Sequence, residues 1–275
     1  MPTDLTAFTF PIRGEKLSQT VEVRDVIFRG QSPYQSIEIF DTEIFGRMLL
    51  LDGHIQLTEF DEKAYHEGLV QIPLMNLDRP SRALVVGGGD GGVIRELCRS
   101  ASMTHIDMVE IDQLVVDTCR QHLPSLSAGA FDDPRVHLHI ADAFPFVKQD
   151  LKPYDLIVVD STDTYEDEEG EISEMLFTKE FYQDLARLLQ PQGLLVTQAD
   201  NLVFCPYSLE DIKGLFGQVF PVVESYQALV PSFGGFSGYC TASHGRKLDP
   251  KAAIPAGMQY LNPVTYSLAF QPLSF

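Results

Sequence analysis

The sequence is poor in basic residues, in cysteine and in long apolar runs. Its 275 residues contain 20 Lys and Arg against 39 Asp and Glu, which leaves a net charge of −19. Such a surface repels nucleic acid and anionic membranes and attracts small cations, although taken alone the acidity does no more than favour solubility. The longest apolar runs, such as Ala83–Val86, have the length of strands and not of membrane spans.

The few cysteines exclude two further classes of protein. Cys98, Cys119, Cys205 and Cys240 include no CxxC pair, so the sequence predicts neither a zinc knuckle nor a disulfide framework. The segment Met1–Pro11 lacks the basic start and the continuous apolar stretch of a signal peptide. We therefore expect a cytoplasmic enzyme that acts on small molecules, without a metal and without nucleic-acid or membrane partners.

The first 77 residues have the pattern of a small β domain. Short alternating runs occupy Thr20–Arg29, Tyr34–Phe40, Met48–Leu51 and His54–Thr58, and Asp52-Gly53 supplies a hairpin turn between the last two. Asp61–Leu77 then has the apolar spacing of a helix, which Asp78-Arg79-Pro80 ends. We expect an N-terminal β-hairpin domain with a linking helix over residues 1–77.

From Arg82 onward strands and helices alternate. Strands are expected at Ala83–Val86, Ile106–Ile111, Val136–Ile140, Leu156–Val159 and Leu194–Thr197, with helices at Gly91–Ser100, Gln113–His122, Phe144–Gln149 and Glu180–Leu189. Val219–Glu224 and Gly238–Ala242 are expected to close the sheet as an antiparallel pair. Because this alternation indicates βαβ units, residues 78–275 are predicted to form a Rossmann-like, doubly wound and mostly parallel sheet, and the fold class is α/β.

A glycine-rich turn joins the first parallel strand to its helix. Gly87, Gly89 and Gly92 satisfy the GxGxxG pattern, which lets the backbone approach a ligand beside a helix N-terminus. A tight turn without a ligand is the alternative. Asp90 lies inside the pattern, and its carboxylate would repel a pyrophosphate but would suit a cationic ligand.

Acidic residues end the next two strands. Glu110 ends the second strand, where a carboxylate accepts hydrogen bonds from ribose hydroxyls, while Asp112 is expected to cap the following helix. Asp142 and Ala143 follow the third strand, where adenine-binding carboxylates lie in enzymes that use adenosyl sulfonium compounds; alone, Asp142 would be a helix cap. Together these strand ends favour an adenosyl thioether or sulfonium over NAD.

The fourth strand ends in two more carboxylates. Asp160 and Asp163 are three residues apart at the carboxyl edge of the sheet, where they face the same crevice as the glycine turn. With Asp90 they form an acidic cluster that suits a polyamine beside a sulfonium. The alternative is the start of a solvated loop.

Motifs along nearly the whole chain resemble those of the polyamine aminopropyltransferases, and among these the spermidine synthases. The matching segments are Leu50–Gln56, Tyr65–Glu67, Gly87–Arg95, Val109–Asp112, Asp160–Asp163, Leu176–Tyr182, Val196–Gln198 and Tyr260–Phe270. This family transfers an aminopropyl group from decarboxylated S-adenosylmethionine, a co-substrate, to an amine and releases methylthioadenosine. The resemblance implies an N-terminal β domain, a methyltransferase-like sheet, a homodimer or homotetramer, and putrescine as the acceptor.

The resemblance also assigns roles to individual residues. The donor would bind to Gln35, Gly87, Gly89, Asp90, Glu110, Asp142 and Ala143, with Asp90 against its aminopropyl ammonium. The amine would bind beside Tyr65, His66, Asp90, Asp160 and Asp163. Asp160 would be the catalytic proton acceptor.

Two departures from the family lie on the acceptor side. Thr164–Met175 is longer and more acidic than the family's segment, so we expect either a lid that the amine orders or a solvated loop. Phe233 stands where a tyrosine is often found. Agmatine, cadaverine and spermidine therefore remain alternative acceptors. The rival functions are a methyltransferase on the same fold, a nucleoside sensor, and an NAD-linked dehydrogenase, against which Asp90 and Asp142 argue.

Overall fold

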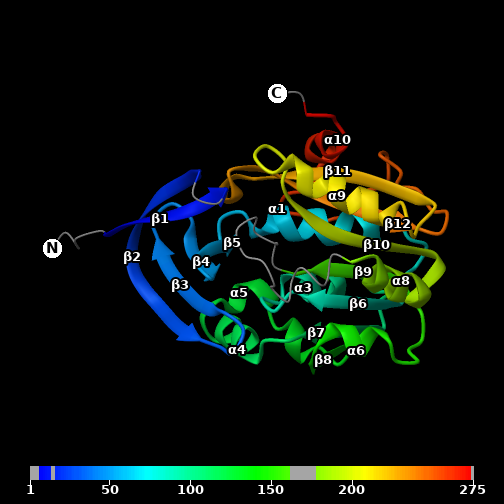
Figure 1. Cartoon of the computed structure of the whole chain (residues 1–275), viewed down its shortest axis with the longest axis horizontal. Helices are drawn as coiled ribbons and strands as arrows, with labels where there is room; N and C mark the ends of the chain where they lie inside the picture. The colour runs from blue at the N-terminus through cyan, green and yellow to red at the C-terminus, as the bar shows by residue number, and fades with distance from the viewer. Residues whose placement is uncertain (1–5, 14–15, 162–177, 274–275) are drawn as a thin grey trace.

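The computed structural model describes residues 6–13, 16–161 and 178–273. A five-stranded N-terminal sheet lies beside a seven-stranded sheet formed by the rest of the chain (Figure 1). Asp163 and the predicted lid, Thr164–Met175, lie outside the described residues. None of the helices in the described ranges is long and apolar enough to cross a membrane.

The N-terminal sheet is an antiparallel meander whose strands follow chain order. Its strands are β1 (Thr6–Arg13), β2 (Leu17–Gln31), β3 (Ser36–Thr42), β4 (Gly46–Leu51) and β5 (His54–Thr58). β2 is longer than the predicted strand Thr20–Arg29, because its pairing with β3 shifts after Val23 and again after Val26, which interrupts the alternation. β1 has no counterpart in the sequence prediction.

A continuous helix links the two sheets. It comprises α1 (Glu62–His66), the π-helical segment η1 (Glu67–Gln71) and α2 (Ile72–Leu74). The π segment begins at Glu67, whose buried carboxylate accepts hydrogen bonds of 2.7–3.0 Å from the backbone N–H groups of residues 259–261. These bonds fix the linking helix to the C-terminal part of the chain, and α1 carries Tyr65 and His66.

The larger sheet is parallel over five of its seven strands. Its strands are β6 (Arg82–Gly87), β7 (His105–Glu110), β8 (Val136–Ile140), β9 (Tyr154–Asp160), β10 (Leu189–Asn201), β11 (Val222–Val230) and β12 (Gly235–Ser243), in the spatial order β11-β12-β10-β9-β6-β7-β8. β12 pairs antiparallel with both β10 and β11. Because the strand order reverses between β6 and β9, their carboxyl ends form the switch point at which open α/β sheets bind ligands.

Helices cover both faces of this sheet. The linking helix, α3 (Gly92–Cys98) and α10 (Pro263–Ala269) pack on one face, and α6 (Ala143–Val147), α8 (Lys179–Leu188) and α9 (Pro206–Phe216) pack on the other. Val85 and Val158 point to the first face, whereas Leu84 and Ile157 point to the second. The strands are therefore buried on both faces, which explains their continuous apolar runs.

The N-terminal sheet is attached to the larger sheet through apolar packing. Ile37 and Leu49 on its inner face pack against Val115 and Leu126, which lie on α4 (Gln113–His122) and α5 (Pro124–Ser127). This packing holds β3 and β4 over the carboxyl end of β7, so the two sheets together enclose the switch point.

The predicted α/β fold class, with a mostly parallel doubly wound sheet and a small all-β N-terminal part, is confirmed. α4 and β8 have the predicted bounds, and the expected antiparallel pair is present as β11 and β12. The first strand of that pair begins at Val222, three residues later than predicted, and α9 was not predicted. The domain division after residue 77 stays a prediction.

Candidate active site

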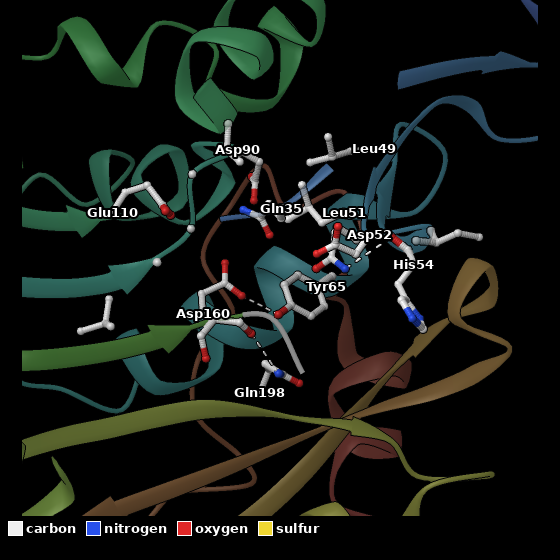
Figure 2. Close-up of a pocket in the computed structure, with 18 of the residues that line it drawn as sticks. Gln35, Leu49, Leu51, Asp52, His54, Tyr65, Asp90, Glu110, Asp160 and Gln198 are labelled. Atoms are coloured by element: carbon white, nitrogen blue, oxygen red, sulfur yellow. Dashed lines mark hydrogen bonds between the residues drawn. The ribbon is translucent and has the colours of Figure 1, made fainter. Parts of the chain in front are cut away.

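A cavity of about 420 Å³ lies at the switch point, with residues of both sheets in its wall. Every predicted site residue within the described ranges lines it: Gln35, Tyr65, His66, Gly87, Gly89, Asp90, Glu110, Asp142, Ala143 and Asp160. Tyr65 and Asp160 face each other in Figure 2, with Gln198 beside them and Asp52 and His54 on the side of the N-terminal sheet. The structure thus brings together residues that are up to 125 positions apart in the chain.

The glycine turn is shaped by close contacts with two site residues. At Gly87, which has φ +80°, a Cβ would lie 2.2 Å from the carbonyl oxygen of Asp160, and at Gly92 a Cβ would lie 2.3 Å from the ring of His66. The neighbouring Gly88 N–H donates a 2.9 Å hydrogen bond to the same carbonyl oxygen. Glycine at these positions therefore lets the turn approach β9 and α1.

Asp160 ends β9 inside the cavity. Its Oδ1 accepts a 2.5 Å hydrogen bond from the Tyr65 hydroxyl. Burial and then the charge of Asp90 raise the pKa of this carboxyl well above its ordinary value, while the charge of His66 and the bond from Tyr65 act in the opposite direction. Asp160 is therefore a stronger base than an exposed aspartate.

His66 is buried between two carboxylates. Only 1% of its side chain is exposed; its Nδ1 lies 2.8 Å from Glu62 Oε2, and its Nε2 lies 3.3 Å from Asp90 Oδ1. The second contact is an ion pair that lacks the alignment of a hydrogen bond. Burial alone would lower the pKa of His66, but the charge of Asp90 and the contact with Glu62 raise it to about 10. His66 is an imidazolium at neutral pH.

Glu110 lies at the end of β7, where it is 8% exposed. Its Oε1 accepts a 2.9 Å hydrogen bond from the backbone N–H of Asp112. Burial is the main reason that the pKa of Glu110 rises to about 7, and the charges of Asp112 and Asp160 add to it. This carboxylate is placed to accept hydrogen bonds from a ligand, and its charge changes near neutral pH.

Two neighbouring aspartates cap helices, which was the expectation for Asp112 and the alternative for Asp142. Asp112 caps α4 by accepting a 3.0 Å bond from Leu114 N–H, and its second oxygen accepts a 3.0 Å bond from Gln35 Nε2, which places Gln35 in the wall of the cavity. Asp142 caps α6 through a 2.8 Å bond from Phe144 N–H. Asp142 therefore has a local structural function in addition to lining the cavity.

The sequence analysis assigned no role to Gln198, Asp200 and Ser232, which line the cavity, and it noted Phe233 only as a departure from the family. Gln198 at the end of β10 donates a 3.1 Å hydrogen bond to the carbonyl oxygen of Ser161, and Phe233 packs edge-on against Tyr65 with ring centroids 5.7 Å apart. Gln198 falls within a matched motif, whereas the approach of residues 231–233 to α1 depends on tertiary structure alone.

Three side chains in the cavity have the composition of a metal site. Ligand atoms of His66, Asp90 and Asp160 lie within 4.8 Å of one another. A metal would have to displace the proton that the raised pKa of His66 holds on the ring. The two carboxylates outnumber the single imidazolium charge, so the cluster suits an organic cation with N–H donors better than a metal ion.

Comparison with protein families matches almost the whole chain. The family model described as the spermine/spermidine synthase domain matches residues 62–250, and the model described as the spermidine synthase tetramerisation domain matches residues 9–59. The first match contains α1, the glycine turn and the ends of β7, β9 and β10. The second match covers most of the N-terminal sheet.

Characterised proteins and solved structures agree with these matches. The chain is 40% identical to a spermidine synthase of Coffea arabica, over 86% of this chain and 74% of that protein. It is 39% identical to a polyamine aminopropyltransferase of Alkaliphilus oremlandii, over 80% of this chain and 76% of that protein. A crystal structure of a spermidine synthase in complex with the transition state analogue AdoDATO superimposes with a TM-score of 0.90, with 28% identity, over 99% of this chain and 94% of that one.

Proposed function

Since this chain belongs to the spermine/spermidine synthase family of aminopropyltransferases, we propose that it makes spermidine by transferring the aminopropyl group of decarboxylated S-adenosylmethionine to putrescine. The second product is methylthioadenosine. The observation that carries this proposal is the presence of two carboxylates, Asp90 and Asp160, within 4.8 Å of each other in one cavity. Two cationic groups, the donor's ammonium and the acceptor amine, have to be held side by side during the transfer.

On the donor side, the nucleoside is proposed to lie between the glycine turn and the N-terminal sheet. Glu110 accepts hydrogen bonds from the ribose hydroxyls, and Asp142 and Ala143 contact the adenine. Gln35, held by Asp112, contacts the nucleoside from the N-terminal sheet. Asp90 pairs with the donor's ammonium, so that the methylene carbon next to the sulfonium is directed toward Asp160. The AdoDATO complex of a structural neighbour supports this donor.

The reaction is an in-line displacement. The nitrogen lone pair of the amine attacks the methylene carbon next to the sulfonium, and the carbon–sulfur bond breaks with its electron pair on sulfur, which leaves as a neutral thioether. Before the attack the ammonium gives up one proton, which frees the nitrogen lone pair, and we assign Asp160 as the acceptor of that proton. The product nitrogen is then a secondary ammonium. A primary amine has an ordinary pKa of about 10, so it arrives protonated and the base is required.

On the acceptor side, Tyr65 and His66 are proposed to border the amine. The Tyr65 hydroxyl fixes the orientation of the Asp160 carboxylate, and its ring packs on Phe233. The role of Asp163, as a second carboxylate for the amine, stays a prediction because Asp163 lies outside the described residues.

The experiment that tests the function measures methylthioadenosine release from the decarboxylated donor with a panel of amines. We expect the highest kcat/KM with putrescine, and lower values with cadaverine, agmatine and spermidine. A higher kcat/KM with one of the other three amines would support aminopropyl transfer but would show that this amine, and not putrescine, is the preferred acceptor. Methyl transfer from intact S-adenosylmethionine, without methylthioadenosine release from the decarboxylated donor, would overturn the proposal in favour of a methyltransferase.

The N-terminal sheet is proposed to mediate association into a homodimer or homotetramer. The family model that matches it is described as a tetramerisation domain, and it exposes apolar side chains such as Ile44, which is 69% exposed. Phe60, just beyond β5, is 61% exposed. Light scattering after gel filtration should give a mass two or four times that of the chain, and Ile44→Asp should lower it. A monomer at micromolar concentration would contradict this proposal.

A further inference from the structure

Glu62 is a buried carboxylate that the proposed reaction does not use. It is 4% exposed and it does not line the cavity. Its Oε2 lies 2.8 Å from His66 Nδ1 and 2.9 Å from Arg95 Nη2, and its Oε1 lies 2.9 Å from Lys63 Nζ. Although burial acts to raise the pKa of Glu62, the bond to His66 and the charges of His66 and Arg95 lower it to about 2. Glu62 is therefore a permanent anion.

The His66 ring is held firmly between Glu62 and the glycine turn. It lies one helical turn after Glu62 on α1, and the absence of a side chain at Gly92 allows the ring to pack directly under the start of α3. Asp90 Oδ1 accepts a 2.6 Å bond from Gly92 N–H and lies 3.3 Å from His66 Nε2. Both of these contacts fall on one oxygen of Asp90, so the carboxylate has a defined orientation.

We propose that Glu62 is a positioning residue that holds His66 as an imidazolium, and that this fixed charge keeps Asp160 ionised beside Asp90. The inference rests on the proposed function in one respect: it takes Asp90 as the partner of the donor's ammonium and Asp160 as the base beside it.

The need for a fixed positive charge follows from the distance between the two aspartates. Carboxylates within 4.8 Å of each other repel, and without a nearby cation one of them takes up a proton. The charge of Asp90 raises the pKa of Asp160, and the charge of His66 lowers it. A protonated Asp160 has no capacity to accept a proton from the amine, so loss of the imidazolium charge would remove the base at neutral pH.

The charged groups around His66 come from each element packed against it. α1 supplies Glu62, Lys63 and Tyr65, α3 supplies Arg95, the glycine turn supplies Asp90, β9 supplies Asp160, and β12 supplies Tyr239, whose hydroxyl donates to the Tyr65 carbonyl oxygen. Glu62 is the anion among them that does not face the cavity. Its charge is therefore available to His66 whether or not ligands are bound.

Nitrogen NMR of the His66 ring in the full-length enzyme tests the charge state without any assay of the reaction. In the wild type we expect both ring nitrogens to stay protonated at pH 8. In Glu62→Gln we expect the pKa of His66 to fall by about 1–3 units, the usual effect of losing an adjacent opposite charge. A neutral His66 in the wild type at pH 8 would overturn the proposal, and this arm needs no variant to fold.

Glu96→Gln provides a matched control, because it also removes a buried carboxylate that contacts Arg95. Glu96 is fully buried and contacts Arg95 Nε at 2.9 Å, Gln71 Nε2 at 2.9 Å and Arg99 Nη1 at 3.5 Å. We expect this variant to leave the pKa of His66 unchanged, although it loses a comparable contact. An equal shift in both variants would mean that packing around Arg95, and not the charge of Glu62, controls His66, and would contradict the proposal.

The pH profile of kcat/KM separates a positioning role from a structural one. His66 and Asp160 interact and therefore titrate as a pair. In Glu62→Gln the proton that Glu62 holds on His66 passes in part to Asp160, so the acid limb should move to higher pH by roughly 1 unit. The loss of activity should be large at pH 6.5 and recover by pH 9. A loss that is the same at every pH would overturn the proposal. If the wild type transfers no aminopropyl group, the proposed function fails, whereas the NMR result still decides the role of Glu62.

Discussion

The Tyr65 hydroxyl and the Asp160 carboxylate, 95 positions apart in the chain, are joined by a 2.5 Å hydrogen bond across the cavity. Tyr65 lies on the helix that links the two sheets, and Asp160 ends a central strand of the larger sheet. The bond therefore sets the position of the linking helix relative to the strand that carries the proposed base.

Asp160→Asn should leave donor affinity nearly unchanged and lower turnover by about 10²–10⁴-fold, the usual contribution of a general base. The amide keeps the shape of the side chain but has much lower basicity. Single-turnover kinetics with saturating donor measure the effect. Asp150→Asn, at an exposed carboxylate in the loop before β9, should retain wild-type turnover. Near-normal turnover in Asp160→Asn would remove this residue from the chemistry.

Tyr65→Phe should shift the acid limb of kcat/KM to higher pH. Burial and Asp90 raise the pKa of Asp160, while the hydrogen bond from Tyr65 stabilises its ionised form and lowers that pKa. The base is active only above its pKa. Without the Tyr65 hydroxyl, a higher pH is therefore required to ionise Asp160. The phenylalanine ring retains the contact with Phe233.

Tyr266→Phe is the control for the pH profile. Tyr266 lies on α10, and its hydroxyl donates a hydrogen bond to the carbonyl oxygen of Asp249. It should leave the acid limb unchanged. An unshifted limb in Tyr65→Phe would indicate that Asp160 does not set the pH dependence.

Glu110→Gln should weaken binding of the donor and of methylthioadenosine together, with little effect on the amine. The wild type should also bind methylthioadenosine more weakly at pH 6 than at pH 8. The raised pKa of Glu110, about 7, means that the carboxyl is protonated below that pH and accepts ribose hydroxyl bonds less well. Calorimetry at both pH values measures this. Unchanged nucleoside affinity in the variant would show that the nucleoside lies elsewhere.

Asp107→Asn should reduce stability without affecting the chemistry. The Asp107 carboxylate lies outside the cavity and accepts hydrogen bonds from His105 Nε2 at 2.7 Å, Tyr154 Oη at 2.8 Å and His139 Nε2 at 2.9 Å. We expect the free energy of unfolding at pH 7 to fall by about 1.5–3 kcal/mol, the range for hydrogen bonds to a charged group. Urea titration measures it, and turnover per folded molecule should stay at the wild-type level.

The stability difference between the wild type and Asp107→Asn should depend on pH. Burial raises the pKa of Asp107, but the bonds from His139, Tyr154 and His105 outweigh it and lower the pKa below the ordinary value of 3.8. The contribution of the carboxylate is therefore complete above the unfolded-state pKa and is lost as the pH falls through the lower folded-state pKa. A difference that does not shrink as the pH falls through the folded-state pKa of Asp107 would contradict this assignment.

Regular local patterns made parts of the fold predictable. α4 was predicted with its bounds because Asp112 caps it and the apolar spacing continues to His122. β1 was not predicted, since its short stretch becomes a strand only by pairing with β2. α9 begins at Pro206 without a side-chain cap, so its start has a weak sequence signal.

The sequence predicts residues that line the cavity but not the contacts behind them. Strand ends and the glycine turn identify Asp90, Glu110 and Asp160, because parallel strands bring their carboxyl ends to one edge. The sequence analysis did not single out Glu62, which pairs with His66 at positions i and i+4. Its significance depends on burial and on the approach of Gly92, which only the folded chain shows.

The most direct test of the account follows the label of a decarboxylated donor that carries ¹³C in its aminopropyl group. With putrescine, the wild type should give ¹³C-labelled spermidine and an equal amount of unlabelled methylthioadenosine, and Asp160→Asn should give both products at a rate lower by about 10²–10⁴-fold. Putrescine that acquires a methyl group from the donor, or a nucleoside product without labelled spermidine, would contradict the account.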